Sequence, residues 1–207
     1  MEPAIKSRLV NGAARLGVSL DAPTVAKLGR YLELLLLWNR KINLTAITDP
    51  VQVVDRHFLD SLVVAPLLGD AAGLVDVGSG AGFPGAVLAI LRPTLAVTCV
   101  ESVRKKVAFL QTLKTELAPN LEPVCARHDE LIRQGRTFDV AISRATWDPA
   151  AWVREGADLV GPRGALLAMG TGDQVQVTAT PAGFVAGEGL AYEVGSARRW
   201  LQQFRRA

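Results

Sequence analysis

Hydrophobic residues recur at helical spacing through about the first seventy residues of the chain. This spacing predicts helices over residues 3–16, 21–39 and 49–68. The second and third are each expected to begin at an aspartate cap followed closely by a proline, Asp21 with Pro23 and Asp49 with Pro50. Residues 1–70 are therefore predicted to form a small helical extension.

From residue 71 onward, short apolar runs alternate with helical stretches. Strands are predicted over residues 74–77, 95–100, 122–125, 138–143 and 164–169, and helices over 84–91, 103–117 and 149–159. Runs at 190–194 and 199–204 predict an antiparallel hairpin that closes the chain. A βαβ progression forms a mostly parallel sheet with right-handed crossovers. We therefore expect residues 71–207 to form one α/β domain.

A glycine-rich segment separates the first predicted strand from the apolar helix that follows it. Its pattern is Asp76-x-Gly78-x-Gly80-x-Gly82. Glycine permits positive φ and a close approach of the backbone to a ligand. The free N–H groups of the helix start attract a polar or anionic group. The segment predicts a nucleotide-like cofactor at this turn, and the alternative is a tight turn that binds nothing.

The residues around the turn favour one cofactor over another. Gly80, Gly82 and Gly85 also match G-x-G-x-x-G, which is typical of dinucleotide sites and leaves a NAD-dependent dehydrogenase as an alternative. However, Asp76 is a poor neighbour for a pyrophosphate and a good one for a cation. S-adenosylmethionine (SAM) carries a sulfonium and an ammonium group and no phosphate. The segment thus looks like the SAM-binding motif of class I methyltransferases, with Asp76, Gly78, Gly80 and Gly82 as candidate contacts.

Polar residues at the ends of the other predicted strands are further candidates, because ligands of open α/β sheets lie there. Glu101 ends the second strand, where it either accepts from two ribose hydroxyls or lies solvated at a helix start. Arg127, His128 and Asp129 follow the third strand; there Asp129 or the adjacent backbone either faces the adenine or belongs to a polar loop. Arg144 follows the fourth, either holding a substrate phosphate or the SAM carboxylate, or lying at the surface.

The predicted site lacks the groups that more demanding methyl transfers need. Trp147-Asp148-Pro149-Ala150 stands where amino-group methyltransferases carry Asn/Asp-Pro-Pro-aromatic, and only the Asp-Pro is present, so we interpret Asp148 as a helix cap. The chain has no Pro-Cys pair to attack a pyrimidine carbon. Transfer to an existing lone pair, such as guanine N7, needs only in-line positioning. The residues therefore suit N7 alkylation and other simple acceptors, with no catalytic acid or base identified.

Five segments in order between residues 38 and 145 resemble the RsmG/GidB family of bacterial ribosomal small-subunit methyltransferases. They are residues 38–45, 57–62, 76–85, 101–106 and 138–145. The resemblance implies a Rossmann-like class I methyltransferase fold: a mostly parallel seven-stranded sheet, helices on both faces and a small helical N-terminal extension. It also implies SAM-dependent N7 methylation of a guanine in the 530 loop of 16S rRNA. The implied SAM contacts are Gly78, Phe83, His128, Asp129 and Arg144.

The chain departs from the family pattern in the positions of its basic residues. The family often carries Lys-Gly after the fifth strand, whereas residues 168–170 here are Ala-Met-Gly, so another cation is expected to replace a lysine that assists RNA or substrate binding. The basic-apolar last strand of the family corresponds to residues 198–201. The candidate RNA contacts are Arg40, Lys41, Arg127 and Arg198, and Arg144 is the candidate that orients the substrate. A non-catalytic RNA-binding protein that kept the fold is the remaining alternative.

Several N-terminal residues have structural interpretations. His57 and Asp60 lie three apart on one helix face and are expected to pair and lock the helices together. Trp38 and Phe58 are interpreted as core residues, and Asn39 as a brace for the connector after the second helix.

Composition narrows the setting of the protein. The formal net charge of +3 permits an RNA partner, either 16S rRNA or the small ribosomal subunit, without establishing one. The longest apolar run, residues 34–38, is far too short to span a bilayer, so we expect a cytoplasmic protein with no membrane contact. Cys99 and Cys125 are predicted to be reduced core residues. No metal site is predicted, and we expect a monomer.

Overall fold

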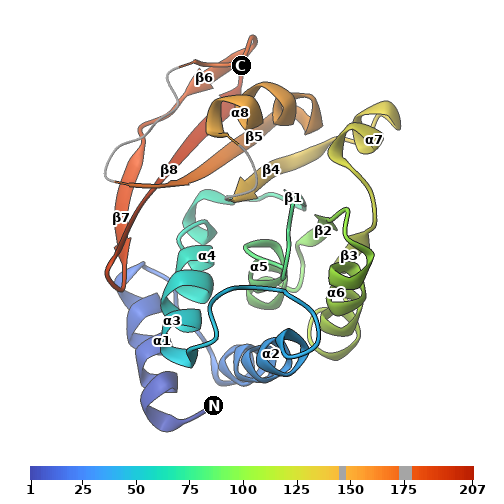
Figure 1. Ribbon diagram of the computed structural model, residues 1–207. Coiled ribbons are helices and arrows are strands. Elements are labelled where there is room, and N and C mark those ends of the chain that lie inside the picture. The colour runs from blue at the N-terminus through green and yellow to red at the C-terminus, as the bar shows by residue number, and fades with distance from the viewer. Residues whose placement is uncertain (145–147, 173–178) are drawn as a thin grey trace.

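The chain folds around one central sheet in the computed structural model, which describes residues 1–144, 148–172 and 179–207 (Figure 1). Ala145 and Trp147, which belong to two sequence motifs, therefore lie outside the described residues. Helices α1 (Pro3–Arg15) and α2 (Ala22–Asn39) come first, and Asp21 caps α2 by accepting a hydrogen bond from the Thr24 N–H at 2.8 Å.

The α/β part alternates strands and helices as predicted, with one further helix at residues 128–133 and one further strand at residues 184–186 that were not predicted. Its strands are β1 (Gly73–Val77), β2 (Ala96–Val100), β3 (Leu121–Val124), β4 (Phe138–Arg144), β5 (Val160–Thr171), β6 (Phe184–Ala186), β7 (Leu190–Val194) and β8 (Ala197–Arg206). Its helices are α5 (Gly85–Leu91), α6 (Arg104–Glu116), α7 (His128–Arg133) and α8 (Pro149–Gly156), with a short 3-10 turn, η3 (Ala157–Leu159). Asp148 caps α8 by accepting from the Ala151 N–H at 2.9 Å, as expected.

The strand order is β3-β2-β1-β4-β5-β8-β6, and β7 also pairs with β8. Strands β1 to β5 run parallel to one another, whereas β8 is antiparallel to β5, so the mostly parallel sheet is confirmed. The expected number of seven strands was wrong by one in the described part of the chain. The ten-residue β8 is long enough to pair with β7 along 197–201 and with the three-residue β6 along 204–206.

The closing hairpin of β7 and β8 is confirmed. Val194 pairs with Ala197 across a two-residue turn, and the first turn residue, Gly195, has a φ of 62°. Tight hairpins favour glycine at this position because the right-handed twist of the strands requires positive φ there.

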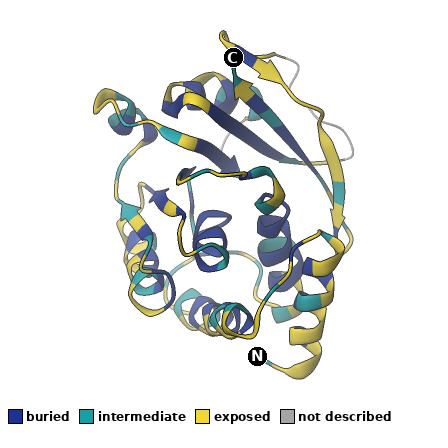
Figure 2. Ribbon diagram, turned by 180° about the vertical axis from the view of Figure 1, so that it is seen from behind, coloured by how far each residue is buried: buried dark blue, intermediate teal, exposed yellow. Residues whose placement is uncertain are grey.

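Buried hydrophobic residues form one core cluster on each face of the sheet. Figure 2 colours the buried residues dark blue along the ribbon. Leu74 points to the first core, which the N-terminal helices, α5 and α6 cover, whereas Val75 points to the second, beneath α7 and α8. This alternation follows from the two-residue period of a strand. The division of the chain at residue 70 stays a prediction, but the N-terminal helices contribute to the same core as β1.

The third predicted helix, 49–68, is not continuous. It divides into α3 (Pro50–Val53), a π-helical turn η1 (Val54–Leu59), α4 (Asp60–Leu62) and a 3-10 turn η2 (Ala65–Leu67). Within it, the Ser61 hydroxyl donates to the His57 carbonyl at 2.6 Å. Such wide turns occur often at functional sites, and hydrophobic spacing alone does not reveal them.

Two smaller expectations had different outcomes. Cys99 is buried as expected, but Cys125 is exposed, because it follows the last residue of β3 and lies beyond the sheet. Asn39 braces the connector as predicted: its amide donates to the Thr45 carbonyl at 2.8 Å and accepts from the Leu44 N–H at 2.8 Å.

Candidate functional site

The glycine segment forms a loop after β1 in a backbone conformation that suits glycine. Gly78, Gly80 and Gly82 have φ values of 72°, 57° and 94°. The Gly80 N–H donates to Glu101 Oε2 at 3.0 Å, which ties the loop to the end of β2. The prediction that these glycines permit positive φ is confirmed.

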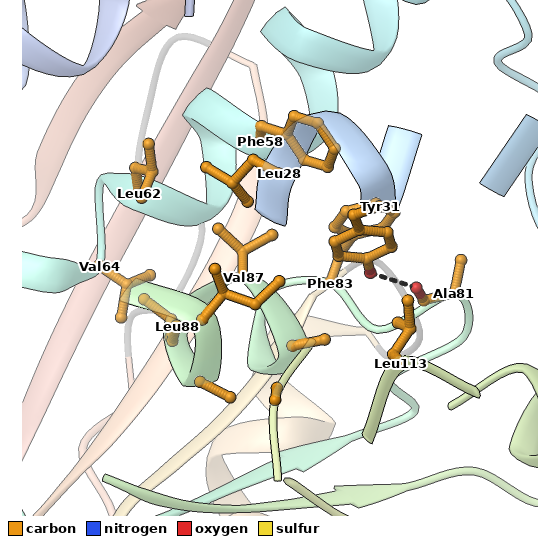
Figure 3. Packing of buried hydrophobic residues seen from close by; sticks show 14 of the residues in the cluster. Leu28, Tyr31, Phe58, Leu62, Val64, Ala81, Phe83, Val87, Leu88 and Leu113 are labelled. Atoms are coloured by element: carbon orange, nitrogen blue, oxygen red, sulfur yellow. Dashed lines mark hydrogen bonds between the residues drawn. The ribbon is translucent and has the colours of Figure 1, made fainter. Parts of the chain in front are cut away.

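Aromatic rings fix this loop to the N-terminal helices (Figure 3). The Tyr31 hydroxyl donates to the Ala81 carbonyl, and its ring stacks on Phe83 at 5.2 Å between centroids. His57 also stacks on Phe83, at 4.5 Å. The Phe83 side chain is buried in this stack. The contact of Phe83 with SAM stays a prediction.

Asp76 lies beneath the loop rather than in a cavity. Its Oδ2 accepts from the Gly85 N–H at 2.8 Å, at the start of α5, and its Oδ1 has no hydrogen-bond partner among the described residues. Complete burial raises the pKa of Asp76 to about 7, opposed by the hydrogen bond from Gly85 and by Arg144. Asp76 thus braces the start of α5, and its contact with a cofactor stays a prediction.

A first cavity, which we call the loop cavity, opens at the carboxyl ends of β1 and β2 and beyond the end of β3. Its volume is about 390 Å³. It brings together Gly78, Gly80, Glu101 and His128 from the predicted cofactor contacts, and Arg127 from the predicted RNA contacts. Gly82, Asp76 and Asp129 do not line it.

Glu101 is the principal acceptor in the loop cavity. It is 7% exposed, and its two carboxylate oxygens accept from the Gly80 N–H at 3.0 Å and from the Val103 N–H at 2.9 Å. Each carboxylate oxygen has two lone pairs, so each keeps capacity for one more donor. The group is therefore fixed in place and still able to accept from a ligand with two hydroxyls.

His128 and Asp129 begin α7, a helix where only a loop was considered. His128 is buried, and its Nε2 lies 2.7 Å from Glu155 Oε2 on α8. Asp129 instead turns to Arg133, whose Nη1 donates to it at 2.8 Å and whose hydrogen bond lowers the pKa of Asp129. The adjacent residues thus point to different surroundings, because a helix turns by about 100° per residue.

A second cavity, which we call the arginine cavity, lies at the carboxyl ends of β4 and β5. It measures about 360 Å³, and its polar lining includes Arg56, His57, Asp60, Arg144, Tyr192 and Arg199. Arg144, which was predicted to contact either SAM or the substrate, lines this cavity and not the loop cavity. Its guanidinium lies 5.4 Å from the centre of the Phe83 ring, so the glycine loop lies next to it.

Contacts of Arg144 correct the expected pairing of His57 with Asp60. Arg144 Nη1 donates to Asp60 Oδ2 at 2.6 Å and to the Arg56 carbonyl at 3.0 Å, and its Nη2 lies 3.2 Å from His57 Nδ1. Both residues therefore contact Arg144, because the π-helical turn η1 changes their angular spacing. His57 and Asp60 therefore hold η1 and α4 against β4 through Arg144, and not against each other.

Asp60 is the centre of this cluster. It is 2% exposed; its Oδ1 accepts from the Tyr192 hydroxyl at 2.8 Å and lies 3.9 Å from Arg199 Nε. Burial, followed by the charge of Asp60, raises the pKa of Tyr192. One buried carboxylate thus joins η1 and α4 to β4, β7 and β8.

The four predicted RNA contacts lie in three separate places and not in one cavity. Arg40 and Lys41 are exposed just after α2, and Arg127 lies at the loop cavity. Arg198 is exposed on β8 and donates to Glu193 at 3.2 Å. Sequence reasoning missed Arg56, Tyr192 and Arg199, although the absence of the lysine at 168–170 was a signal that another cation lies nearby.

Metal-binding clusters and membrane-spanning helices are both absent from the part of the chain that the structure describes. In residues 1–144, 148–172 and 179–207, no group of three or more His, Cys, Asp or Glu side chains is arranged to hold a metal ion. Within the same ranges, no helix is long and apolar enough to cross a membrane.

Known proteins with related sequences identify the family. The model of the GidB family, described as rRNA small subunit methyltransferase G, matches residues 24–186. The chain belongs to this family. A ribosomal RNA small subunit methyltransferase G from Azoarcus is 45% identical over 86% of the chain and 84% of its own length. Another, from Anaeromyxobacter, is 43% identical over 82% of the chain and 80% of its length.

Solved structures support the same fold for this GidB family member. An O-methyltransferase from Bacillus cereus in complex with SAH aligns with a TM-score of 0.61 at 17% identity, covering 85% of this chain and 90% of its own. A SAM-dependent methyltransferase from Aquifex aeolicus gives a TM-score of 0.53 at 17% identity, over 77% and 94% of the two chains. The expected Rossmann-like methyltransferase fold is thereby confirmed.

Proposed function

We propose that this protein is a SAM-dependent methyltransferase that methylates N7 of a guanine in the 530 loop of 16S rRNA. The observation that carries the proposal is the pair of cavities beside the glycine loop. One contains the fixed carboxylate of Glu101, and the other contains three arginines. Family membership and the names of the relatives support the reaction class and the RNA.

The loop cavity fits the adenosine part of SAM. Glu101 keeps an acceptor lone pair on each oxygen for a ribose diol. A Cβ added to Gly80 would have one neighbour, the Gly78 carbonyl at 3.9 Å, so the backbone is open to a ligand. When bound, SAM supplies the methyl group, and this chain's residues hold the ribose and exclude water. Gly78, Gly80, Glu101 and His128 are the proposed contacts.

The arginine cavity fits an acceptor that needs no deprotonation. His57 is held neutral, because burial and the charge of Arg144 lower its pKa to about 3, and its Nδ1 faces Arg144. The Asp60 carboxylate is engaged by Arg144 and Tyr192. Guanine N7 carries a free lone pair, so its alkylation depends on orientation rather than on a base. Arg144 is the proposed orienting residue.

The testing experiment uses small ribosomal subunits from cells that lack this gene, incubated with the full-length protein and radiolabelled SAM. The rRNA is then cleaved chemically at 7-methylguanosine, and the break is mapped by primer extension. We expect one new stop, at a guanine of the 530 loop. Naked 16S rRNA, assayed in parallel, identifies which of the two forms is the substrate.

Other outcomes have defined meanings. Label in the rRNA without cleavage retains the methyltransferase and refutes N7. SAM binding without transfer, beside an active control enzyme, refutes the proposed substrate. RNA binding without SAM binding favours the non-catalytic alternative. In a binding assay in which SAM competes with NAD, a preference for NAD favours the dehydrogenase.

A further inference from the structure

The arginine cavity carries unbalanced positive charge. Of the lining residues that the structure describes, Arg56, Arg144 and Arg199 are cationic and Asp60 is anionic, so three positive groups against one negative leave an excess of two. An anion that enters such a partly enclosed site is stabilised, because the surroundings screen charge less than bulk water does. The cavity is therefore suited to a ligand that carries negative charge.

Asp60 does not neutralise all three arginines equally. Its Oδ2 accepts from Arg144 at 2.6 Å and its Oδ1 accepts from Tyr192 at 2.8 Å. Arg199 Nε lies 3.9 Å from Oδ1, which is beyond hydrogen-bonding distance, and has no hydrogen-bond partner among the described residues. Arg199 thus keeps donor capacity, although its side chain is only 16% exposed.

The strand pairing explains how Arg199 reaches this place. In the antiparallel register it lies opposite Thr171 of β5 and Tyr192 of β7, both of which line the cavity. Its neighbour Trp200 points to the opposite face and is completely buried there. Arg199 therefore supplies a cation beside residues 169–171 from the adjacent strand.

We propose that the arginine cavity binds a phosphate of the acceptor RNA and that Arg199 is the ligand of that phosphate. The assignment of this phosphate to the RNA rests on the proposed function. A guanidinium presents paired N–H donors that match two phosphate oxygens, which a lysine does not. The cavity of about 360 Å³ is large enough for a nucleotide, and it adjoins the glycine loop through Arg144 and Phe83.

The first test measures binding of the full-length protein to small ribosomal subunits between about 50 and about 200 mM salt. Each phosphate contact adds close to one unit to the slope of log K against log salt, so Arg199→Gln should lower that slope by about one. Arg205→Gln is the matched control, because Arg205 is an exposed arginine of the same strand outside the cavity. Its slope loss should be smaller than that of Arg199→Gln.

Two readouts separate phosphate binding from structural damage. The SAM affinity of Arg199→Gln should equal that of the wild type, and its KM for subunits should rise by about tenfold while kcat changes by less than about twofold. A loss of RNA affinity with an unchanged slope overturns the proposal, as does an equal loss in Arg205→Gln.

A second measurement needs no variant. With the loop cavity saturated by S-adenosylhomocysteine, guanosine 5′-monophosphate should bind the wild-type protein about tenfold more tightly than guanosine, because only the nucleotide carries a phosphate. Equal affinities refute the phosphate site. If the wild type binds the nucleotide more tightly but transfers no methyl group to subunits, the proposed function fails while the anion site stands.

Discussion

Nη2 of Arg144 lies 3.2 Å from Nδ1 of His57, which fixes how the histidine ring is used. An arginine only donates, so Nδ1 accepts, and the proton of the neutral ring belongs to Nε2. That nitrogen lies 2.9 Å from the Thr45 hydroxyl oxygen, to which it donates. A neutral histidine thus joins β4 to the connector after α2 while its ring stacks on Phe83.

This arrangement predicts an acid-dependent loss of stability. Because the pKa of His57 is about 3 in the folded protein against 6.5 in the unfolded chain, the unfolded state binds the extra proton as pH falls through 6.5. The free energy of unfolding of the wild type relative to His57→Gln should therefore drop by about 2 kcal/mol from about pH 7.5 to about pH 5. Urea denaturation at both values measures it. Parallel pH dependences of the two proteins would contradict the assigned protonation state.

The burial of Asp76 predicts a pH dependence of the free energy of unfolding that has the opposite sign. Burial raises its pKa from 3.8 to about 7, so between these values the folded state keeps a proton that the unfolded state releases. Stability from this group is present below the lower pKa and is lost as pH rises through the upper one. Asp76→Asn should therefore gain on the order of 2 kcal/mol relative to the wild type between about pH 5 and about pH 7.

The control for Asp76 comes from β4. Asp139 also accepts from backbone at the start of β1, at 2.8 Å from Ala72 N and 2.9 Å from Gly73 N, but it is exposed. Its Asn variant should not reproduce the relative gain. A gain of equal size in both variants would show that burial of Asp76 is not the cause.

Gly82 and Gly80 predict different costs for the same substitution. A Cβ on Gly82 would lie 2.7 Å from the Tyr31 hydroxyl and 2.9 Å from the Ala86 Cβ, at a φ of 94°. Gly82→Ala should thus cost about 2–5 kcal/mol through overpacking and backbone strain, measured by thermal or urea unfolding. Gly80→Ala, which meets only a carbonyl at 3.9 Å, should cost about 1 kcal/mol. Equal costs would contradict the packing of this loop against Tyr31.

Glu101→Gln should weaken SAM binding by about tenfold or more in titration calorimetry. The amide has one acceptor oxygen, so its NH₂ group must face the N–H of either Gly80 or Val103, and the ligand loses a charged acceptor. Glu122→Gln is the control, because Glu122 lies on β3 and pairs with Arg136 outside both cavities. Unchanged SAM affinity in Glu101→Gln would remove this residue from the proposed cofactor site.

The sequence by itself determined the elements whose signals are local. Capping pairs such as Asp21 with Pro23 depend on neighbouring residues, and so does the glycine loop after β1. The parallel sheet follows from the alternation of apolar runs with helical stretches, since crossovers have a fixed hand. For the same reason the positions of Glu101 and His128 at strand ends were predictable, and the loop cavity contains both.

Only the tertiary structure decided the arginine cavity. Asp60, Arg144 and Arg199 are separated by more than 50 residues at each step along the chain, and their contacts depend on a π-helical turn and on the register of β8. From the sequence, Arg198 was a predicted RNA contact and Arg199 was not, although a strand points these neighbours to opposite faces. Which residues of β8 face which side of the sheet is decided when β8 pairs with β5 and Trp200 is buried in the core. The residues near Arg199 in the sequence do not determine this choice.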